Sequence, residues 1–440
     1  MARIAFVGAG SVTFTRMLLT DLFSHSALAT VTIALHDIDP ERLATAEAIA
    51  RRVACTAGAA PRIEAHLDRR AAIAGADYVI NMIQVGGHEA TVRDHRIPAA
   101  YGLRQTIGDT LGIGGIFRAL RTIPVMRAIA ADMAELCPDA WLLNYTNPMA
   151  MVCWATYGAS SHQRVVGLCH SVPNTVDKLA ALVGVPAKEV SFLAAGVNHQ
   201  AFLLRFEHEG KDLYPRLDEA IDRDPELART VRVELYRRLG YFPSESSEHS
   251  AEYLPWFMRR DDDIDHFRIE PGSYVAMSEE NLAEYRETRR LLAEDAPLPA
   301  DEGPAGSANE YAPQIILAME TGHSRAIYAN VENNGLIDNL PGGACVEVPC
   351  VVDKTGVRPL SVGTMPPQLA ALNRTFLNVC ELTVRAAVHG RREHVYHAAM
   401  LDPNTAATLS LPDIRRLCDS LIAAHGDLMP DGVRTVGAHR

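Results

Sequence analysis

The chain has 440 residues, of which 48% are hydrophobic and 22% are charged, and its formal net charge at pH 7 is −12. This is the balance of an ordinary globular protein, and the length suggests two structural units or one large composite domain. The acidic charge argues against nucleic acid or an anionic membrane as the main partner, since both require a basic surface. Because no apolar run could span a bilayer and the first residues do not resemble a signal peptide, we expect a cytoplasmic protein.

Short apolar runs, each followed by a helical pattern, occupy the first part of the chain. They lie at residues 3–7, 31–39, 77–83, 141–146 and 164–170. Strands that alternate with helices predict βαβ units, and hence a parallel, doubly wound, Rossmann-like sheet in the α/β class.

The alternation fades after about residue 190. Residues 191–197 and 201–207 look like neighbouring strands, and 213–240 is strongly helical. The Pro- and Gly-rich stretch 295–306 predicts a surface loop, and the acidic run 261–265 predicts a solvated turn. We therefore predict a Rossmann-like domain over 1–190 and an α+β region over 191–440.

The eight cysteines are scattered along the chain and form no CxxC pair. A disulfide framework would be denser and is typical of small secreted proteins. We expect most of these thiols to be buried packing groups. Only Cys169 has neighbours that suggest chemistry.

A glycine loop follows the first predicted strand. Gly8 permits the tight turn, and Gly10 lets the backbone approach a pyrophosphate at the start of the next helix, beside Ser11. Thr13 replaces the usual third glycine, and a plain strand–helix turn is the alternative. Asp37, at the end of the second strand, suits the ribose hydroxyls of a dinucleotide and would repel a 2′-phosphate, so NAD is favoured over NADP.

Two asparagines, Asn144 and Asn147, lie at the end of the fourth predicted strand. Ligands of open parallel sheets bind at the carboxyl ends of the strands, so these amides could hold a sugar hydroxyl or the nicotinamide ribose. Alternatively, the Asn-Pro pair at 147–148 simply starts a turn and caps a helix.

Cys169 and His170 follow the fifth strand, and His199 lies about thirty residues later. A thiolate and an imidazole could form part of the ligand shell of a divalent metal, with open positions for substrate and water. Each residue could equally be a satisfied core group, and the spacing alone does not decide.

A dense polar and aromatic segment spans 244–256 and contains Tyr253. A tyrosine can act as a base when nearby positive charge lowers its pKa. The alternative is an exposed helix cap with a packed Tyr/Trp pair.

Taken together and in this order, these segments resemble glycoside hydrolase family 4, the NAD- and divalent-metal-dependent glycosidases. The resemblance rests on GAGSVTF, HDIDPERL, QTIGDTLGIGGIFRALRTIP, LNYTNPMAM, GLCHSV, AGVNH, ESSEHSAEYLPWF, NNGLIDNLPGGACVEVP and VYHAAMLDPNTAA. It is strongest toward the bacterial α-galactosidase (melibiase) branch. It implies a lactate dehydrogenase-like fold in which residues 191–440 form an added catalytic and oligomerisation region. It also implies NAD and Mn or another divalent metal as cofactors, and a homodimer or homotetramer.

The resemblance also implies ligand and substrate roles. The metal-binding cysteine and histidine of the family match Cys169 and His199, and the substrate-binding asparagine matches Asn147. An arginine in the sugar site of some members matches Arg93, which could instead be a structural ion pair.

Three residues match the family's catalytic positions. The base tyrosine matches Tyr253, and the acid near the metal matches Asp109. His170 stands where phospho-sugar members have an acid or amide after the metal cysteine. The proton donor is therefore His170 or Asp109.

The implied reaction is hydrolysis of an α-galactoside by oxidation at C3, elimination at C1–C2, addition of water and reduction, with NAD regenerated. Such NAD-dependent enzymes are exceptions to the pair of carboxylates that most glycosidases use. The family alternatives are an α-glucosidase, an α-glucuronidase or an α-galacturonidase. Outside the family, the alternatives are an NAD-dependent hydroxy-acid dehydrogenase and a non-catalytic NAD-binding protein.

Overall fold

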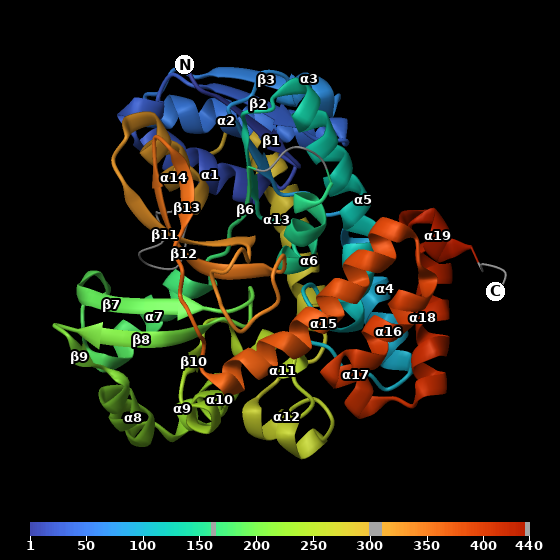
Figure 1. The fold of residues 1–440 in the computed structure, drawn as a ribbon. Coiled ribbons are helices and arrows are strands. Elements are labelled where there is room, and N and C mark those ends of the chain that lie inside the picture. Colours follow the sequence, from blue (N-terminus) through green and yellow to red (C-terminus); the bar gives the residue numbers. More distant parts are fainter. Residues whose placement is uncertain (160–163, 299–309, 436–440) are drawn as a thin grey trace.

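The parallel sheet predicted from the alternating runs is present in the computed structural model, which describes residues 1–159, 164–298 and 310–435 (Figure 1). Nine strands form the main sheet, in the order β13-β12-β11-β6-β5-β4-β1-β2-β3. Its strands are β1 (Arg3–Val7), β2 (Thr32–His36), β3 (Arg62–His66), β4 (Tyr78–Asn81), β5 (Trp141–Asn144), β6 (Val165–Gly167), β11 (Arg325–Glu332), β12 (Cys345–Asp353) and β13 (Gly356–Pro359).

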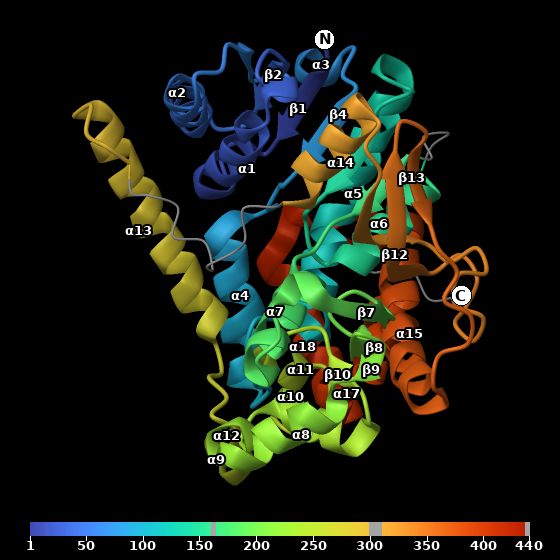
Figure 2. The same ribbon diagram turned by 90° about the vertical axis from the view of Figure 1, so that its left-hand side faces the viewer.

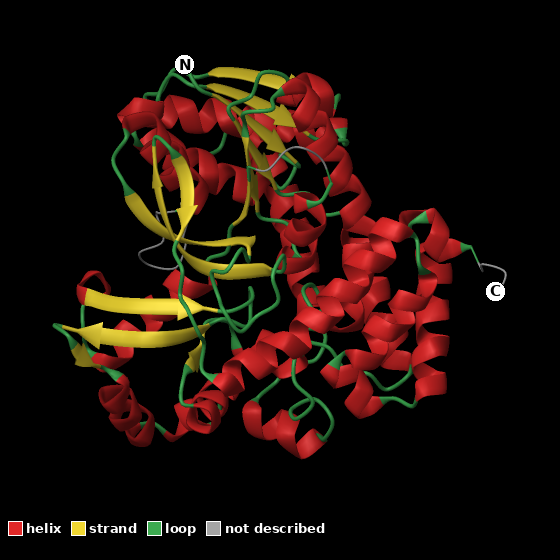
Figure 3. Ribbon diagram, in the orientation of Figure 1, coloured by secondary structure: helices red, strands yellow, loops and turns green. Residues whose placement is uncertain are grey.

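Strands β1 to β6 are parallel and have the order of a doubly wound dinucleotide fold. The central strands are almost wholly buried, because helices cover both faces of the sheet (Figure 3). The predicted strands coincide with β1, β2, β4, β5 and β6. The missed strand, β3, has a partly exposed, charged sequence at the sheet edge and therefore shows no apolar run.

The main sheet also includes strands from the second half of the chain. The antiparallel strands β11, β12 and β13 extend it beyond β6, and β11 joins β6 where Asn330 pairs with Gly167. The division at residue 190 stays a prediction, and these strands place part of 191–440 in the same sheet as 1–190.

A second, smaller sheet contains the two neighbouring strands predicted after residue 190. Its members are β7 (Val190–Ala195), β8 (Phe202–His208), β9 (Lys211–Asp212) and β10 (Phe242–Pro243), and β7 pairs antiparallel with β8. The predicted helical stretch 213–240 consists of α8 (Tyr214–Arg223), α9 (Pro225–Ala228) and α10 (Val231–Leu239).

The helices that flank the parallel strands come mostly from the first half. They are α1 (Val12–Ser24), α2 (Pro40–Ala57), α3 (Arg69–Ile73), α4 (Gly87–Ala100), α5 (Gly112–Leu136), α6 (Met149–Tyr157), α7 (Ser171–Val183) and α14 (Tyr311–Thr321). The first half of α5 is buried on all sides, and its N-terminus lies next to the candidate site described below.

A helical layer from the C-terminal part packs beside α4 and α5 (Figure 1). It consists of α15 (Pro367–His389), α16 (Arg392–Leu401), α17 (Pro403–Thr408), α18 (Leu411–His425) and α19 (Asp431–Arg434). Helices α11 (Ser247–Glu252) and α12 (Asp261–Phe267) lie at its lower end, and α13 (Ser273–Ala293) runs along α4 and α2 at the side of the molecule (Figure 2).

The prediction of a turn at 261–265 was wrong, because these residues begin α12. Three aspartates occupy the first turn of that helix, where the positive end of the helix dipole stabilises negative charge. The predicted loop at 295–306 lies mostly outside the described residues.

The eight cysteines are all free, and six of them are buried. Cys345 and Cys350 both lie on β12. Within the described part of the chain, no helix is both long enough and apolar enough to cross a membrane.

Candidate active site

The glycine loop connects β1 to α1 and lies against Asp37. Gly8 has a φ of +87°, and a side chain there would meet the backbone of Ile83. The Asp37 carboxylate accepts a hydrogen bond of 2.8 Å from the Gly10 N–H, and a Cβ on Gly10 would lie 2.5 Å from that carboxylate. Ser11 makes no side-chain cap to α1. The first N–H groups of α1 are therefore free of a side-chain cap, as a pyrophosphate-binding helix requires.

Asn144 lies apart from any open surface. Its amide is fully buried and bonds to Asn81, to the backbone of Thr146 and to the sulfur of Met149. These contacts tie the ends of β4 and β5 together. The structure thus gives Asn144 a place in the interior, and its predicted cofactor contact stays a prediction.

Three potential metal ligands converge at the ends of β6, β7 and β10. The Nε2 atom of His199 lies 3.4 Å from Sγ of Cys169 and 3.3 Å from Oε2 of Glu245. A ligand atom from each residue lies within 4.8 Å of the others. This soft–borderline–hard donor set fits a divalent transition metal, and three protein ligands leave positions for substrate.

The other ring nitrogen of His199 faces a separate network. Its Nδ1 atom lies 3.0 Å from Oγ1 of Thr110, and that hydroxyl donates a 2.7 Å bond to Asp109. Because the Thr110 hydroxyl donates its only proton to Asp109, it accepts from Nδ1 of His199. The lone pair of Nε2 is then free and faces Cys169 and Glu245, as a metal ligand needs.

The predicted base, Tyr253, is part of this network. Its hydroxyl lies 3.3 Å from Nδ1 of His199 and 3.0 Å from Nδ1 of His249, and the ring is 1% exposed. Burial and the carboxylates of Glu252 and Asp109 raise the pKa of Tyr253 well above its usual value. A cation held on the far side of His199 would oppose that rise.

Asp109 is held as an acceptor. Its Oδ2 accepts a 2.9 Å bond from the amide of Asn147, whose backbone oxygen in turn accepts from Arg118. Burial raises the pKa of Asp109, but the charges of His249 and Arg118 outweigh it and bring the value to about 2. The structure therefore brings Asp109 and Asn147 together, with Asp109 ionised at neutral pH.

A glutamate that was not singled out from the sequence fixes the loop before Asp109. Glu252 is 2% exposed and accepts backbone N–H bonds from Thr106, Ile107 and Gly108 at 2.8 to 3.1 Å. Since Glu252 immediately precedes Tyr253, one carboxylate joins the segment of the tyrosine to the loop of Asp109.

His170 pairs with a second unforeseen glutamate. Its Nε2 lies 2.5 and 2.6 Å from the carboxylate oxygens of Glu310, and its ring stacks on Tyr145. Burial opposes protonation, but the Glu310 charge prevails and raises the pKa of His170. The contact with Glu310 therefore favours the protonated form of His170.

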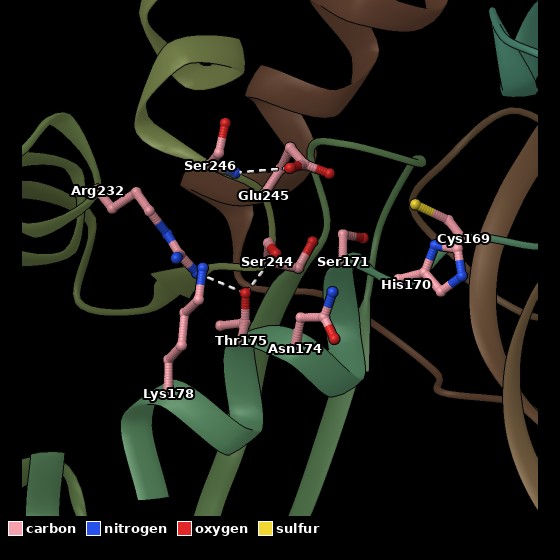
Figure 4. Close-up of a pocket in the computed structure, with 10 residues that line it drawn as sticks. All are labelled: Cys169, His170, Ser171, Asn174, Thr175, Lys178, Arg232, Ser244, Glu245 and Ser246. Atoms are coloured by element: carbon pink, nitrogen blue, oxygen red, sulfur yellow. Dashed lines mark hydrogen bonds between the residues drawn. The ribbon is translucent and has the colours of Figure 1, made fainter. Parts of the chain in front are cut away.

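A polar cavity of about 210 Å³ begins at Cys169 and His170 (Figure 4). One face of α7 lines it with Ser171, Asn174, Thr175 and Lys178, and the opposite wall carries Arg232 and residues 244–246. Ser171 Oγ and Ser244 Oγ are buried and have no hydrogen-bond partner among the described residues. The cavity therefore presents polar walls to a ligand that enters beside Cys169 and His170.

Arg93 is not brought to this cluster within the chain. It lies on α4, its side chain is 39% exposed, and it pairs with Glu89 one turn earlier at 3.3 Å. This matches the structural ion pair that the sequence left open, and its role toward substrate stays a prediction.

Four site residues were missed or left unassigned in the sequence: Glu245, His249, Glu252 and Glu310. The first three lie in the polar segment 244–256, which was singled out only as a whole and for Tyr253. Glu310 immediately precedes α14, and its 140-residue separation from His170 leaves no local signal.

The chain is similar to known proteins over nearly its whole length. It is 43% identical to an α-galactosidase of Bacillus subtilis (strain 168), with 98% of this chain and 100% of that protein covered. It is 33% identical to an α-galactosidase of Rhizobium meliloti (strain 1021), with 99% and 91% covered.

Solved structures agree in fold. The putative glucosidase of Bacillus subtilis has a TM-score of 0.86 at 25% identity, covering 96% of this chain and 99% of that one. The malate dehydrogenase of Plasmodium falciparum has a TM-score of 0.52 at 13% identity, covering 90% and 100%. The expected lactate dehydrogenase-like fold is confirmed. Residues 3–185 match the family 4 glycosyl hydrolases and residues 194–405 match the C-terminal domain of that family, so the chain belongs to family 4 of the glycosyl hydrolases.

Proposed function

We propose that this protein is an α-galactosidase that works with bound NAD and a divalent metal ion such as Mn²⁺. The observation that carries the proposal is the arrangement around His199. One ring nitrogen faces Cys169 and Glu245, and the other faces the hydroxyl of Tyr253. The names of the 43% and 33% identical relatives support the substrate class.

The glycine loop is the proposed site for NAD. Gly8 and Gly10 have no side chains, so a ligand can approach the backbone of the loop closely. The uncapped start of α1 offers N–H groups to the pyrophosphate. Asp37 stands beside the loop to accept from the ribose hydroxyls. The neighbouring Ile38 is apolar yet 88% exposed, which suits a surface against which the adenine packs.

When bound, NAD⁺ would supply a hydride acceptor and the metal a Lewis acid for a reversible oxidation at C3 of the sugar, two carbons from the glycosidic carbon. Among the protein's own groups, Cys169, His199 and Glu245 hold the metal. Asn147 and the ionised Asp109 are placed to bind hydroxyl groups of the sugar, because one offers an amide and the other a carboxylate in direct contact with each other.

Tyr253 is the proposed base, which removes a proton from the carbon next to the oxidised one. As the tyrosinate, its oxygen would accept that proton. A positively charged His249, whose Nδ1 lies 3.0 Å from this oxygen and 3.8 Å from the Glu252 carboxylate, would stabilise the tyrosinate. The buried position of Tyr253 keeps bulk water from competing for that proton.

His170 is the proposed proton donor to the leaving group. Its pKa is raised, beside the Glu310 carboxylate, whereas the pKa of Asp109 is about 2. An acid that is ionised at neutral pH has no proton to give. Asp109 is therefore assigned to binding and to orienting His199.

The test is hydrolysis of p-nitrophenyl α-galactoside by the dialysed enzyme, with NAD⁺, Mn²⁺ and dithiothreitol added or omitted singly. We expect turnover only with all three, and solvent deuterium at C2 of the released galactose. Full turnover without the dinucleotide, or a product with no deuterium at C2, would refute the proposal. Stoichiometric release of NADH would instead identify a dehydrogenase.

We further propose that the enzyme acts in the cytoplasm as a homodimer or homotetramer. The free thiols, with Cys169 among the proposed ligands, favour a reducing compartment. Size-exclusion chromatography with light scattering measures the mass of the assembly. A mass near 47.9 kDa would show a monomer and contradict the proposed oligomer.

A further inference from the structure

Glu347 is a buried acid that the proposed reaction does not use. It lies on β12 with 0% exposure, and neither of its carboxylate oxygens has a hydrogen-bond partner of regular geometry among the described residues. The side chain of Asn198, directly before His199, is also fully buried, and both of its polar atoms are unpaired by the same measure. A buried carboxylate without a compensating charge is costly to the fold, so such a group either takes up a proton or lies close to a cation.

The position of Glu347 connects the two loops that carry the metal ligands. Across the sheet, Glu347 pairs with Asn330 of β11, and Asn330 pairs with Gly167, two residues before Cys169. On its other side, the backbone of Glu347 exchanges two hydrogen bonds, of 2.8 and 3.2 Å, with Gly196, three residues before His199. One row of residues thus runs from the His199 loop through Glu347 to the Cys169 loop.

The loop of His199 needs such support. His199 itself has a φ of +66°, a conformation that a non-glycine residue adopts only when its surroundings hold it there. The electrostatic environment agrees with the geometry. Burial, then the Glu245 carboxylate and then Glu347 raise the pKa of Cys169. Burial raises the pKa of Glu347 to about 7, although His199 and the amides of Asn198 and Asn330 oppose the rise. The Glu347 carboxyl group therefore interacts electrostatically with both proposed ligands.

We propose that Glu347 is a positioning residue for the metal centre, which fixes the loops of Cys169 and His199 and offsets the charge of a bound divalent ion without ligating it. Outer-shell acids of this kind typically change metal affinity 10- to 100-fold. The inference rests on the metal site of the proposed function.

The test compares Mn²⁺ affinity, from the electron paramagnetic resonance signal of free Mn²⁺, with the melting temperature of metal-free protein. We expect Glu347→Gln to bind Mn²⁺ about 10- to 100-fold more weakly. The metal-free variant should melt no lower than wild type, because a costly buried charge is gone. Glu347→Asp keeps the charge and should bind Mn²⁺ more tightly than Glu347→Gln. Glu64→Gln, at the opposite edge of the same sheet, should bind as wild type does.

Unchanged affinity in Glu347→Gln would overturn the inference, as would equal losses in the Asp and Gln variants. A lower melting temperature of the metal-free Gln variant with unaltered affinity would assign Glu347 to the fold alone and also overturn it. Cys169→Ser distinguishes a failure of the proposed metal site from a failure of the proposed role of Glu347. If that variant binds Mn²⁺ normally, the metal site itself is wrong, whereas weak binding by Cys169→Ser and normal binding by Glu347→Gln refute only the role of Glu347.

Discussion

The carboxylate of Glu252 is the most heavily bonded acid of the candidate site, and its removal should affect stability and rate together. It accepts from three backbone N–H groups, those of Thr106, Ile107 and Gly108, in the loop that leads to Asp109. A hydrogen bond to a charged group contributes about 1.5–3 kcal/mol, so a rigid, dry loop would lose roughly 5–9 kcal/mol in Glu252→Ala. Rearrangement and penetration by water reduce this, and we expect a loss of about 3 kcal/mol.

That free energy corresponds to a measurable shift in melting temperature. At about 2.1 cal/mol/K per residue, the unfolding entropy of 440 residues is about 0.9 kcal/mol/K, so Glu252→Ala should melt about 3 °C lower. Glu252→Gln keeps one carbonyl oxygen as an acceptor and should lose about half as much. kcat should fall in both, because the freed loop carries Asp109 and Thr110, which orient His199.

Calorimetry and the p-nitrophenyl α-galactoside assay measure the two effects. Glu248→Gln, one turn earlier on the same short helix α11, is the matched control and should leave both unchanged, since no hydrogen bond of its carboxylate is found among the described residues. Wild-type melting and kcat in Glu252→Ala would refute the role of the carboxylate. A lower melting temperature with wild-type kcat would show that the loop does not control the chemistry.

The remaining predictions concern the base, the metal and the acid. Tyr253→Phe should keep its Mn²⁺ affinity and lose at least about 100-fold in kcat, and near-normal turnover would exclude the tyrosine as base. Glu245→Gln should weaken Mn²⁺ binding. Peroxide treatment that oxidises Cys169 should release the metal, which a metal-sensitive dye detects. Wild-type Mn²⁺ affinity in the variant, or metal that stays bound after oxidation, would contradict the assignment of that residue as a ligand. Because Glu310 raises the pKa of His170, Glu310→Gln should lower it and move the alkaline limb of the kcat/KM profile to lower pH. A limb that stays or moves upward would exclude His170 as the proton donor.

The parallel half of the fold is predictable from the sequence because its signals are local. A fully buried parallel strand needs an apolar run, and β1 was predicted with the bounds that it has in the structure. The edge strand β3 escaped because one side of it faces solvent and its sequence, Arg62–His66, is charged. The helix α12 was mistaken for a turn because three like charges repel, while the helix dipole that stabilises them is a property of the folded chain.

The site residues likewise fall into those with a local sequence signal and those without one. Cys169 and Asn147 were identifiable because each follows a parallel strand, and such strand ends meet at one edge of the sheet. Glu310 carries no comparable signal, because its partner His170 is 140 residues away and the pairing depends on how α14 docks.

Glu347 shows where a readable signal was overlooked. It stands in the strand sequence CVEVPC, between Val346 and Val348, which are both fully buried, and a glutamate is almost never fully buried without a compensating partner. The pattern alone therefore predicts that something must compensate this acid. What compensates it depends on the antiparallel extension of the sheet, since only the pairing of β12 with β11, and of β11 with β6, carries Glu347 to the loops of the metal ligands. A charged residue in an otherwise apolar strand, such as Glu347, is thus evidence of function before its neighbours are known. The sheet topology then identifies those neighbours as the loops of Cys169 and His199.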